Sequence, residues 1–332
     1  MRRIAVRLPV EAVTASDATP RATLATDTVA GRFARFALRT GRALPPWFAL
    51  WFGGVLGDAF GALPMRDQRR AREHLARAFP RRDATWIRRT ARAAFRHTGR
   101  MALWTVATNQ RSAAVLRRDM PIEGRAWLAR SRAACARGEG VVGVTGHFGN
   151  WELLGRLGGS VLPLSSIGKP MRDAGIDAVV RELRTRGTNR LIPQGAPVMA
   201  SLRELRQGRM LATLPDQDVP RLASVFVPWF GIAAATPSGP GMLAAMARVP
   251  VQPAFCYLRA GRWVMHWGPR TRAPAGLDRD DAALWLTAWT TAYQEALVRR
   301  APEQWVWWHK RWRTRPPGEQ PAQTPRSPPA TT

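Results

Sequence analysis

The sequence predicts an α/β fold in which a mixed, largely parallel sheet is covered by helices, with a helical layer on its N-terminal side. Three observations support this prediction. Residues 32 to about 138 carry helical periodicity, short apolar runs bounded by turn residues begin near residue 140, and helix-like stretches alternate with several of these runs. Buried strands that alternate with helices are typical of a sheet covered on both faces.

The N-terminal layer contains two clear helix patterns. In RDQRRAREHLARAFP (66–80), apolar residues recur on one face and Pro80 ends the helix. Asp83 is expected to cap the next helix. The face of the first helix consists of Ala71, Leu75, Ala78 and Phe79, and one side of the second consists of Trp86, Thr90, Ala93 and His97. His97 is expected to be a packed or surface residue and not a ligand.

The second part of the chain is expected to supply the sheet. The predicted strands are VVGVT (141–145), RLIP (190–193), MLATLP (210–215), SVFVPWF (224–230), VQPAFCYL (251–258) and RWVMHWG (262–268). The predicted helices cover residues 174–187, 196–207, 238–248 and about 279–300. No internal repeat is visible, so we expect one domain over residues 31–314. Residues 1–30 and the proline-rich tail 315–332 are expected to be disordered or flexible.

The charge of the chain is its most unusual bulk property. The 332 residues include 51 basic and 23 acidic side chains, a net charge of +28, and the only lysines are Lys169 and Lys310. Such a surface attracts anionic headgroups, phosphorylated substrates, an acidic carrier protein or nucleic acid. The arginines are spread along the whole chain, and no nucleic-acid-binding motif is recognisable. Nucleic-acid binding is therefore kept only as a remote alternative.

Residues 43–65, ALPPWFALWFGGVLGDAFGALPM, are the candidate membrane segment. Their length suffices for a span, but two prolines, several glycines and Asp58 argue against one. A helix lying in the membrane interface between Arg42 and Arg66 fits the pattern better than a membrane span does. A buried helix of a soluble protein fits it as well as the interfacial helix does. The two cysteines, Cys135 and Cys256, have no metal-ligand spacing and are expected to be buried free thiols in a reducing compartment.

The stretch TGHFGNWELLG (145–155) carries the strongest chemical signal. His147 follows a predicted strand and precedes a predicted helix, which is the edge where α/β sheets bind ligands. Residues five apart on one helix point roughly 140° away from each other, so His147 and Glu152 meet only across a turn. With Asn150 as N-cap, Glu152 lies in the first helical turn, where a carboxylate stays ionised. An ionised Glu152 carboxylate beside the His147 imidazole would form a general-base pair. The same pattern is equally compatible with a histidine that has only a structural role.

Other chemistries match this stretch poorly. Gly143, Gly146 and Gly149 recur every third residue and do not form a dinucleotide-binding fingerprint. Further metal ligands at a useful spacing are missing, and so is the serine of a nucleophile elbow.

Several segments together resemble one enzyme family. TGHFGNWELLG resembles the His-x4-acid motif of the lysophospholipid acyltransferase superfamily, and its form HFGNWE is similar to the lipid A late acyltransferases, also called lauroyl/myristoyl acyltransferases. The further segments that resemble this family, in order, are LPDQD (214–218), VFVPWFGIAAATPSGPGMLA (225–244) and PEQWVWWHKRW (302–312). REHLARAFP (72–80) also resembles the family, with His74 where asparagine is usual. The resemblance covers roughly residues 35 to 315 and implies a glycerol-phosphate-acyltransferase-like fold.

The resemblance also implies an activity. A fatty acyl chain passes from an acyl-thioester, carried by acyl carrier protein or CoA, to a hydroxyl of a phosphorylated glycolipid such as a lipid A precursor. The expected place is the anionic cytoplasmic face of the bacterial inner membrane. No metal, redox cofactor or nucleic acid is implied. An acyltransferase of the same superfamily that acts on another glycolipid or a lysophospholipid is the alternative.

The resemblance assigns roles to individual residues. His147 deprotonates the acceptor hydroxyl and Glu152 orients the histidine, so replacing either with alanine is expected to abolish transfer. Backbone N–H groups around Phe148 and Gly149 are candidate oxyanion donors. Lys169 and Arg172 are candidate phosphate contacts, and Lys169-Pro170 stands where the family commonly has Arg-Pro. Lysine keeps the charge but lacks the bidentate fork of arginine. Solvated surface charges are the alternative interpretation.

Four further positions are candidates for substrate binding. Asp216 and Asp218 alternate along the chain, so an extended segment places them on one face, where the resemblance implies that they help to form the site. A capped turn is the alternative. Backbone donors at Ser238 and Gly239, before an apolar helix, are candidates for an anion site or for ordinary helix capping. His309 is expected to be structural.

Overall fold

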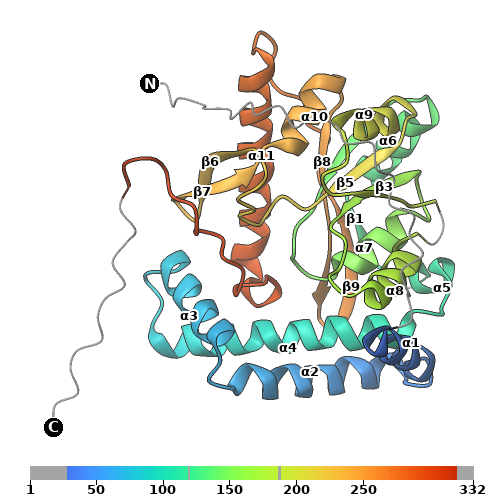
Figure 1. Ribbon diagram of the computed structural model, residues 1–332, viewed down its shortest axis with the longest axis vertical. Helices are drawn as coiled ribbons and strands as arrows, with labels where there is room; N and C mark the ends of the chain where they lie inside the picture. Colours follow the sequence, from blue (N-terminus) through green and yellow to red (C-terminus); the bar gives the residue numbers. More distant parts are fainter. Residues whose placement is uncertain (1–27, 119, 186–187, 320–332) are drawn as a thin grey trace.

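The computed structural model describes residues 28–118, 120–185 and 188–319 (Figure 1). The expected disorder of residues 1–30 and 315–332 therefore lies largely outside the described residues. The described chain has the predicted α/β architecture, with an N-terminal layer of helices below a central sheet in the view of Figure 1.

The N-terminal layer consists of α1 (Val29–Gly41), α2 (Pro46–Ala62), α3 (Arg66–Ala78), α4 (Ala84–Thr108) and α5 (Ala113–Arg117). The two helices that the sequence predicts most clearly are α3 and α4. Asp83 caps α4 as expected, because its side chain accepts a hydrogen bond from the Trp86 backbone N–H. His97 is buried in this helix, as the pattern indicated.

The main sheet has seven strands in the order β1-β9-β8-β2-β5-β3-β4. All pairs are parallel except β8 with β9, which form an antiparallel hairpin. The strands are β1 (Ile122–Glu123), β2 (Val141–Val144), β3 (Leu164–Gly168), β4 (Arg190–Pro193), β5 (Met210–Thr213), β8 (Val251–Arg259) and β9 (Arg262–Trp267). This is the mixed, largely parallel sheet that the alternation of strands and helices predicts.

A separate antiparallel ribbon pairs β6 (Ser224–Trp229) with β7 (Ile232–Pro237). The six predicted strands are all present, whereas β1, β3 and β7 were not foreseen. β1 has only two residues, β3 reads LSSIG, and β7 contains three alanines. Serine and alanine do not favour extended backbone, so pairing with neighbouring strands decides these segments.

Helices cover both faces of the main sheet. The remaining helices are α6 (Arg125–Ala136), α7 (Trp151–Gly158), α8 (Ala174–Arg184), α9 (Val198–Arg206), α10 (Gly239–Ala247) and α11 (Arg279–Arg300), followed by a 3-10 turn, η1 (Pro302–Gln304). Apolar residues of α4, α6 and α7 form one buried cluster with the sheet, and those of α9, α10 and α11 form another. Burial on both faces explains the nearly continuous apolar composition of β2.

α2 packs along α4 at very short range (Figure 1). A Cβ added to Gly99 of α4 would lie 2.1 Å from the Gly53 carbonyl oxygen of α2, so glycine permits this approach. Asp58 of α2 is paired with Arg92 and Arg96 of α4. Among the described residues, no single helix is long and apolar enough to cross a membrane. α2 and α3 satisfy that requirement only as a pair, which is bent by 88°.

Candidate active site

The register of two neighbouring strands brings His147 and Asp216 together. β2 and β5 are parallel, with Val144 opposite Thr213. Each functional residue lies three positions beyond the end of its strand, so the same register carries both to one edge of the sheet. The sequence predicts this edge as the ligand-binding edge, and the structure places both residues there.

His147 is held by Asp216 through two hydrogen bonds. Nδ1 of the ring lies 2.8 Å from Asp216 Oδ1, and the His147 backbone N–H donates to Oδ2 at 2.7 Å. Asp216 Oδ2 also accepts from Gln294 Nε2 at 3.1 Å and from Trp305 Nε1 at 2.9 Å. With Asp216 ionised, Nδ1 carries the proton, and Nε2 is then the basic nitrogen of a neutral ring.

The Asp216 carboxyl is buried but remains ionised. Burial alone raises its pKa, yet the electrostatic attraction of the His147 ring and the hydrogen bonds from His147 and Trp305 outweigh this effect. The pKa of Asp216 therefore lies well below its usual range. An ionised carboxylate beside Nδ1 is the arrangement that stabilises an imidazolium in general-base sites.

The contact expected between Glu152 and His147 is not the one that the structure shows. Asn150 caps α7 as predicted, and Glu152 lies in the first turn. Its carboxylate, however, binds the guanidinium of Arg184 on α8, with Oε1 2.5 Å from Nη2 and Oε2 3.1 Å from Nε. α7 therefore directs Glu152 toward α8, and the carboxylate on the imidazole comes from the neighbouring strand β5.

Asp216 and Asp218 bind different partners, although an extended segment was expected to place them on one face. The chain bends at Gln217, between them. Asp218 accepts hydrogen bonds from the Thr314 backbone N–H at 2.6 Å and from the Thr314 hydroxyl at 3.0 Å. Arg313 also lies near its carboxylate, at 3.7 Å. Asp218 therefore anchors the segment near the C-terminus and does not contact His147.

Three residues near His147 were not foreseen as site residues. The amide nitrogen of Gln217 lies 3.0 Å from both ring nitrogens of His147, and His309 packs edge-on against the same ring at 5.1 Å between centroids. Trp151 contacts the ring as well, at 5.0 Å. Gln217 stands inside the PDQD segment and His309 inside WVWWHKRW. The resemblance to the family covers both segments. Nothing in the sequence marked Gln217 as a site residue, because its amide is neutral, and His309 was expected to be structural.

The backbone donors proposed from the sequence are partly occupied. The Gly149 N–H donates to the Gln304 carbonyl at 2.9 Å, so in this conformation it is not available to an oxyanion. Gly149 has φ +65°, and an added Cβ would lie 2.0 Å from the Cys256 carbonyl oxygen. The Ser238 N–H and hydroxyl both donate to the Ala223 carbonyl, because this residue closes the β6–β7 ribbon. Ser238 is therefore not free for an anion, and Gly239 is the exposed first residue of α10.

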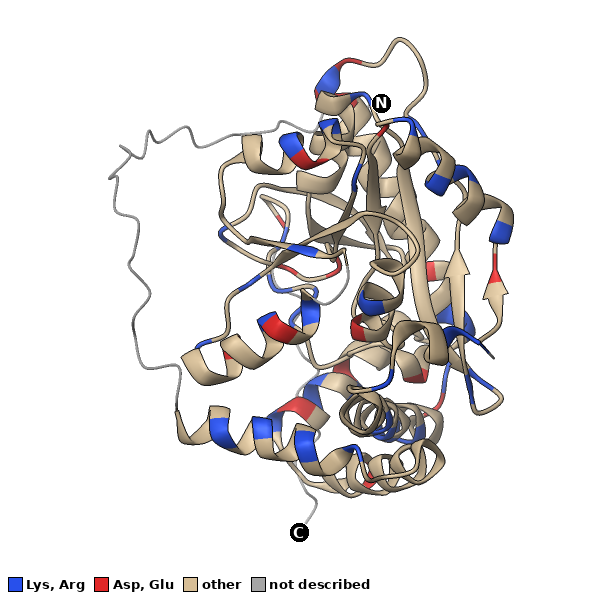
Figure 2. Cartoon of the chain, turned by 90° about the vertical axis from the view of Figure 1, so that its right-hand side faces the viewer, with Lys and Arg blue, Asp and Glu red and all other residues tan. Residues whose placement is uncertain are grey.

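The candidate phosphate contacts lie on the loop between β3 and α8. Lys169 and Arg172 are both exposed, and β3 runs parallel to β5, so the loop begins at the same sheet edge as His147 and Asp216. Within the loop, the Met171 N–H donates to Asp177 of α8 at 2.7 Å. Figure 2 shows that Lys and Arg also lie on many other helices and loops, so charge alone does not mark this loop.

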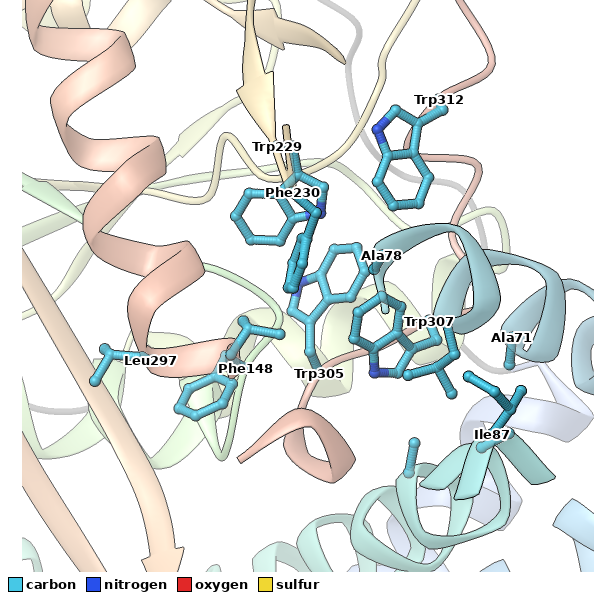
Figure 3. Close-up of a cluster of buried hydrophobic side chains, with 14 of the residues drawn as sticks. Ala71, Ala78, Ile87, Phe148, Trp229, Phe230, Leu297, Trp305, Trp307 and Trp312 are labelled. Atoms are coloured by element: carbon cyan, nitrogen blue, oxygen red, sulfur yellow. The ribbon is translucent and has the colours of Figure 1, made fainter. Parts of the chain in front are cut away.

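An aromatic cluster lies next to the site, and Figure 3 shows its buried side chains. Trp305 is fully buried, and its ring contacts Trp229 at 5.3 Å and Trp307 at 4.8 Å. Phe148 belongs to the same cluster. Trp305 therefore joins the core to the sheet edge of His147 and Asp216, because its indole N–H donates to Asp216. The tryptophans of WVWWHKRW thus pack largely in the core.

Within the residues that the structure describes, no three or more His, Cys, Asp and Glu side chains are grouped to hold a metal ion. Cys135 and Cys256 are buried and free, as their apolar surroundings indicated.

Comparison with known proteins agrees with this architecture. The sequence model of the bacterial lipid A biosynthesis acyltransferases matches residues 23–314. The chain is 28% identical over 298 residues to the lipid A biosynthesis palmitoleoyltransferase of Escherichia coli K12, covering 83% of this chain and 94% of that protein. It is 31% identical over 193 residues to the lipid A biosynthesis lauroyltransferase of the same organism, covering 57% of this chain and 60% of that protein. The chain therefore belongs to the bacterial lipid A biosynthesis acyltransferase family, whose members are O-acyltransferases.

Proposed function

We propose that the chain transfers a fatty acyl group from an acyl-thioester to a hydroxyl of a phosphorylated glycolipid such as a lipid A precursor, with His147 as general base. The observation that carries this proposal is the hydrogen bond from His147 Nδ1 to Asp216, at 2.8 Å. It fixes the tautomer in which Nε2 accepts a proton. The names of the relatives, a palmitoleoyltransferase and a lauroyltransferase of lipid A biosynthesis, support the class of acceptor.

The reaction requires one proton to move twice. His147 Nε2 takes the proton of the acceptor hydroxyl, and the oxygen attacks the thioester carbonyl, so that a C–O bond forms. The C–S bond then breaks, and the imidazolium returns its proton to the departing thiolate. Asp216 stays ionised throughout and stabilises the imidazolium. The products are the acylated lipid and the free thiol of the donor.

Glu152 has a different proposed role from the one that the motif suggests. Its two hydrogen bonds to Arg184 join α7, which follows His147, to α8, which follows the loop of Lys169 and Arg172. A bidentate arginine–carboxylate pair fixes geometry as well as charge. We propose that Glu152 fixes the position of α8, and of the loop of Lys169 and Arg172 before it, relative to α7. The acceptor hydroxyl is then held next to Nε2 of His147.

Lys169 and Arg172 remain the proposed contacts for an acceptor phosphate. Both are exposed cations on the loop that leaves the catalytic edge. The remaining backbone candidate for the oxyanion is the N–H of Phe148, since that of Gly149 is engaged. The donor is an acyl-thioester of acyl carrier protein or of CoA, and both carriers are acidic enough to approach a chain of charge +28.

The membrane contact is proposed for the outer face of α1 and α2. Large apolar side chains are exposed there, including Phe33 (71%), Trp47 (70%) and Trp51 (59%). Figure 1 shows α1 and α2 at the margin of the molecule, with α2 on the far side of α4 from the sheet. Exposed tryptophans beside arginines are typical of helices that lie in a membrane interface. We propose that α2 lies in the plane of an anionic, cytoplasmic-facing leaflet and gives the active site access to lipid.

The test is acyl transfer by the purified chain. Lipid A precursors, other glycolipids and lysophospholipids are offered as acceptors, each with an acyl carrier protein donor and with a CoA donor, and products are identified by mass spectrometry. One added acyl chain on a lipid A precursor, absent with His147→Ala, is the expected result. Acylation of lysophospholipids alone would instead favour the alternative acceptor. Transfer at the wild-type rate by His147→Ala would refute the general base.

A further inference from the structure

Gln217 lies between two imidazole rings. Its amide nitrogen is 3.0 Å from both Nδ1 and Nε2 of His147, and 3.5 Å from Nε2 of His309. The two rings meet edge to face, with 5.1 Å between centroids and 72° between planes. Neither Gln217 nor His309 is hydrogen bonded to Asp216 in the described structure, so their contacts are a second support for the His147 ring besides that of Asp216.

The equal distances place the Gln217 amide over the face of the His147 ring. An atom equally far from both ring nitrogens and lying in the ring plane would overlap Cε1, the carbon between them. The amide nitrogen must therefore lie above the plane, where its N–H points at the π face. The lone pair of Nε2 lies in the plane, so Gln217 leaves it free for the acceptor hydroxyl.

The surroundings of His309 indicate that its ring serves Gln217. Two buried histidines nearby bond to backbone carbonyls, His74 to Trp307 at 2.8 Å and His97 to Gly149 at 3.3 Å, whereas His309 is half-buried. Within the described residues, the polar partner of the His309 ring is Gln217, and Nδ1 of His309 is buried without one. Burial, and then the charge of His147, lower the pKa of His309 to about 4. In its Nδ1–H tautomer, a neutral His309 has the lone pair on Nε2 and accepts the amide N–H.

On this geometry we propose that His309 is a positioning residue, which holds Gln217 over the ring of His147 and so keeps Nε2 directed at the acceptor. The inference rests on the proposed general-base function of His147. Asp216 fixes the ring from its edge at Nδ1, and Gln217 restrains rotation and tilt of its face. Losing the second support leaves the tautomer intact but lets the ring move out of line with the hydroxyl. Misplacement of a reacting group by about 1 Å costs on the order of 100-fold in rate.

Three variants test the proposal by steady-state kinetics. His309→Phe keeps an aromatic ring but removes the acceptor, and Gln217→Leu removes the amide. Each is expected to lower kcat by about 10- to 100-fold, with the KM values of donor and acceptor unchanged. His309→Gln, which restores an acceptor, is expected to recover most of the rate. Because His309 acts through Gln217, the double variant is expected to lose no more than either single variant.

A spectroscopic measurement separates this inference from the assignment of function. With 15N-labelled histidine, NMR reports the environment of the His147 ring nitrogens without any substrate. Changed ring signals are expected in both His309→Phe and Gln217→Leu, with the Nδ1 proton retained. His74→Asn, which removes a buried imidazole but keeps a donor for the Trp307 carbonyl, is the matched control and is expected to leave these signals unchanged.

The outcomes are distinct. Wild-type kcat in His309→Phe, multiplied losses in the double variant, or unchanged His147 signals in both single variants would overturn the proposal. Absence of acyl transfer by the wild-type chain, with the NMR changes present, would instead count against the proposed function and leave the positioning of His147 by Gln217 and His309 standing.

Discussion

His147 and Asp216 are 69 positions apart in the chain, yet Nδ1 of one and Oδ1 of the other lie 2.8 Å apart. The offset equals that of Val144 and Thr213, which face each other in β2 and β5. The pairing of two parallel strands thus sets the geometry of this contact, and each residue needs only to stand at the same distance beyond its strand.

Replacing Asp216 with asparagine tests that contact. The amide keeps the size of the side chain but offers His147 no ionised acceptor, so the ring loses its preferred tautomer and the imidazolium loses its partner. We expect kcat to fall by about 10²- to 10⁴-fold with little change in KM. Asp218→Asn is the matched comparison, since Asp218 binds Thr314, and its effect is expected on thermal stability. A kcat within about twofold of wild type in Asp216→Asn would exclude the assigned role.

Replacement of Glu152 and Arg184 distinguishes the two possible roles of Glu152. If Glu152 acts by holding Arg184, Glu152→Gln and Arg184→Gln raise the acceptor KM to a similar extent, and the double variant is no worse than either. The loss of a charge-assisted hydrogen bond predicts a change of about 10-fold or more. A fall in kcat with Glu152→Gln but not with Arg184→Gln would show that Glu152 acts on His147 instead.

The fold and part of the site were predictable from local patterns. The apolar runs bounded by turns predicted β2, β5 and β8, and Asn150 predicted the start of α7. Proximity along the chain favoured Glu152 as the partner of His147, because the motif names both. The sequence contains no record of strand order, so the adjacency of β2 and β5, and with it the role of Asp216, needed the structure.

The remaining differences also arise from contacts distant in sequence. A bend at Gln217 separates Asp216 from Asp218, although their alternation suggested a common face. His309 reaches His147 only because the segment after α11 folds back across the site. The Ser238 hydroxyl donates a hydrogen bond to the Ala223 carbonyl at the open end of the β6–β7 ribbon. None of these contacts has a signature in composition or periodicity.

Gly146 is expected to be intolerant of a side chain. A Cβ at this position would lie 1.9 Å from Gln294 Nε2 and 2.8 Å from Asp216 Oδ2, between two groups that are hydrogen bonded. Gly146→Ala is expected to displace Gln294, to destabilise the fold by about 1–3 kcal/mol and to lower kcat. At Gly155 on α7 a new Cβ would meet nothing within 4 Å beyond the adjacent residues and backbone of its own helix, so Gly155→Ala is expected to stabilise slightly. Equal behaviour of the two variants in urea unfolding and kinetics would contradict this account.

The outer face of α2 is expected to bind lipid. Trp47→Ser combined with Trp51→Ser removes two exposed rings and is expected to reduce co-sedimentation with vesicles that contain anionic phospholipid by about 10-fold or more. Met199→Ser, at an exposed apolar residue of α9, is the control and is expected to bind as wild type does. Binding is also expected to weaken in neutral vesicles and at high salt, because the chain is strongly basic. Unchanged binding by the double variant would place the membrane contact elsewhere.

The fold is expected to become less stable as the pH is lowered from about 6.5 to about 4, and a variant of His97 tests this. Burial lowers the pKa of His97 from 6.5 to about 4, and the same holds for His74 and His309. The unfolded chain binds protons near pH 6.5 while the folded chain does not bind them until about pH 4, so acidification favours unfolding over that interval.

Each such histidine contributes about 1.4 kcal/mol per pH unit within the window, at most. His97→Gln removes one titrating group, so the free energy of unfolding from urea titrations is expected to fall less steeply between about pH 6.5 and 4.5. Asp216, whose pKa is lowered, loses its stabilising contribution only at more acidic pH and does not affect this interval. An unchanged slope in His97→Gln would mean that His97 is not held neutral by burial beneath the catalytic turn.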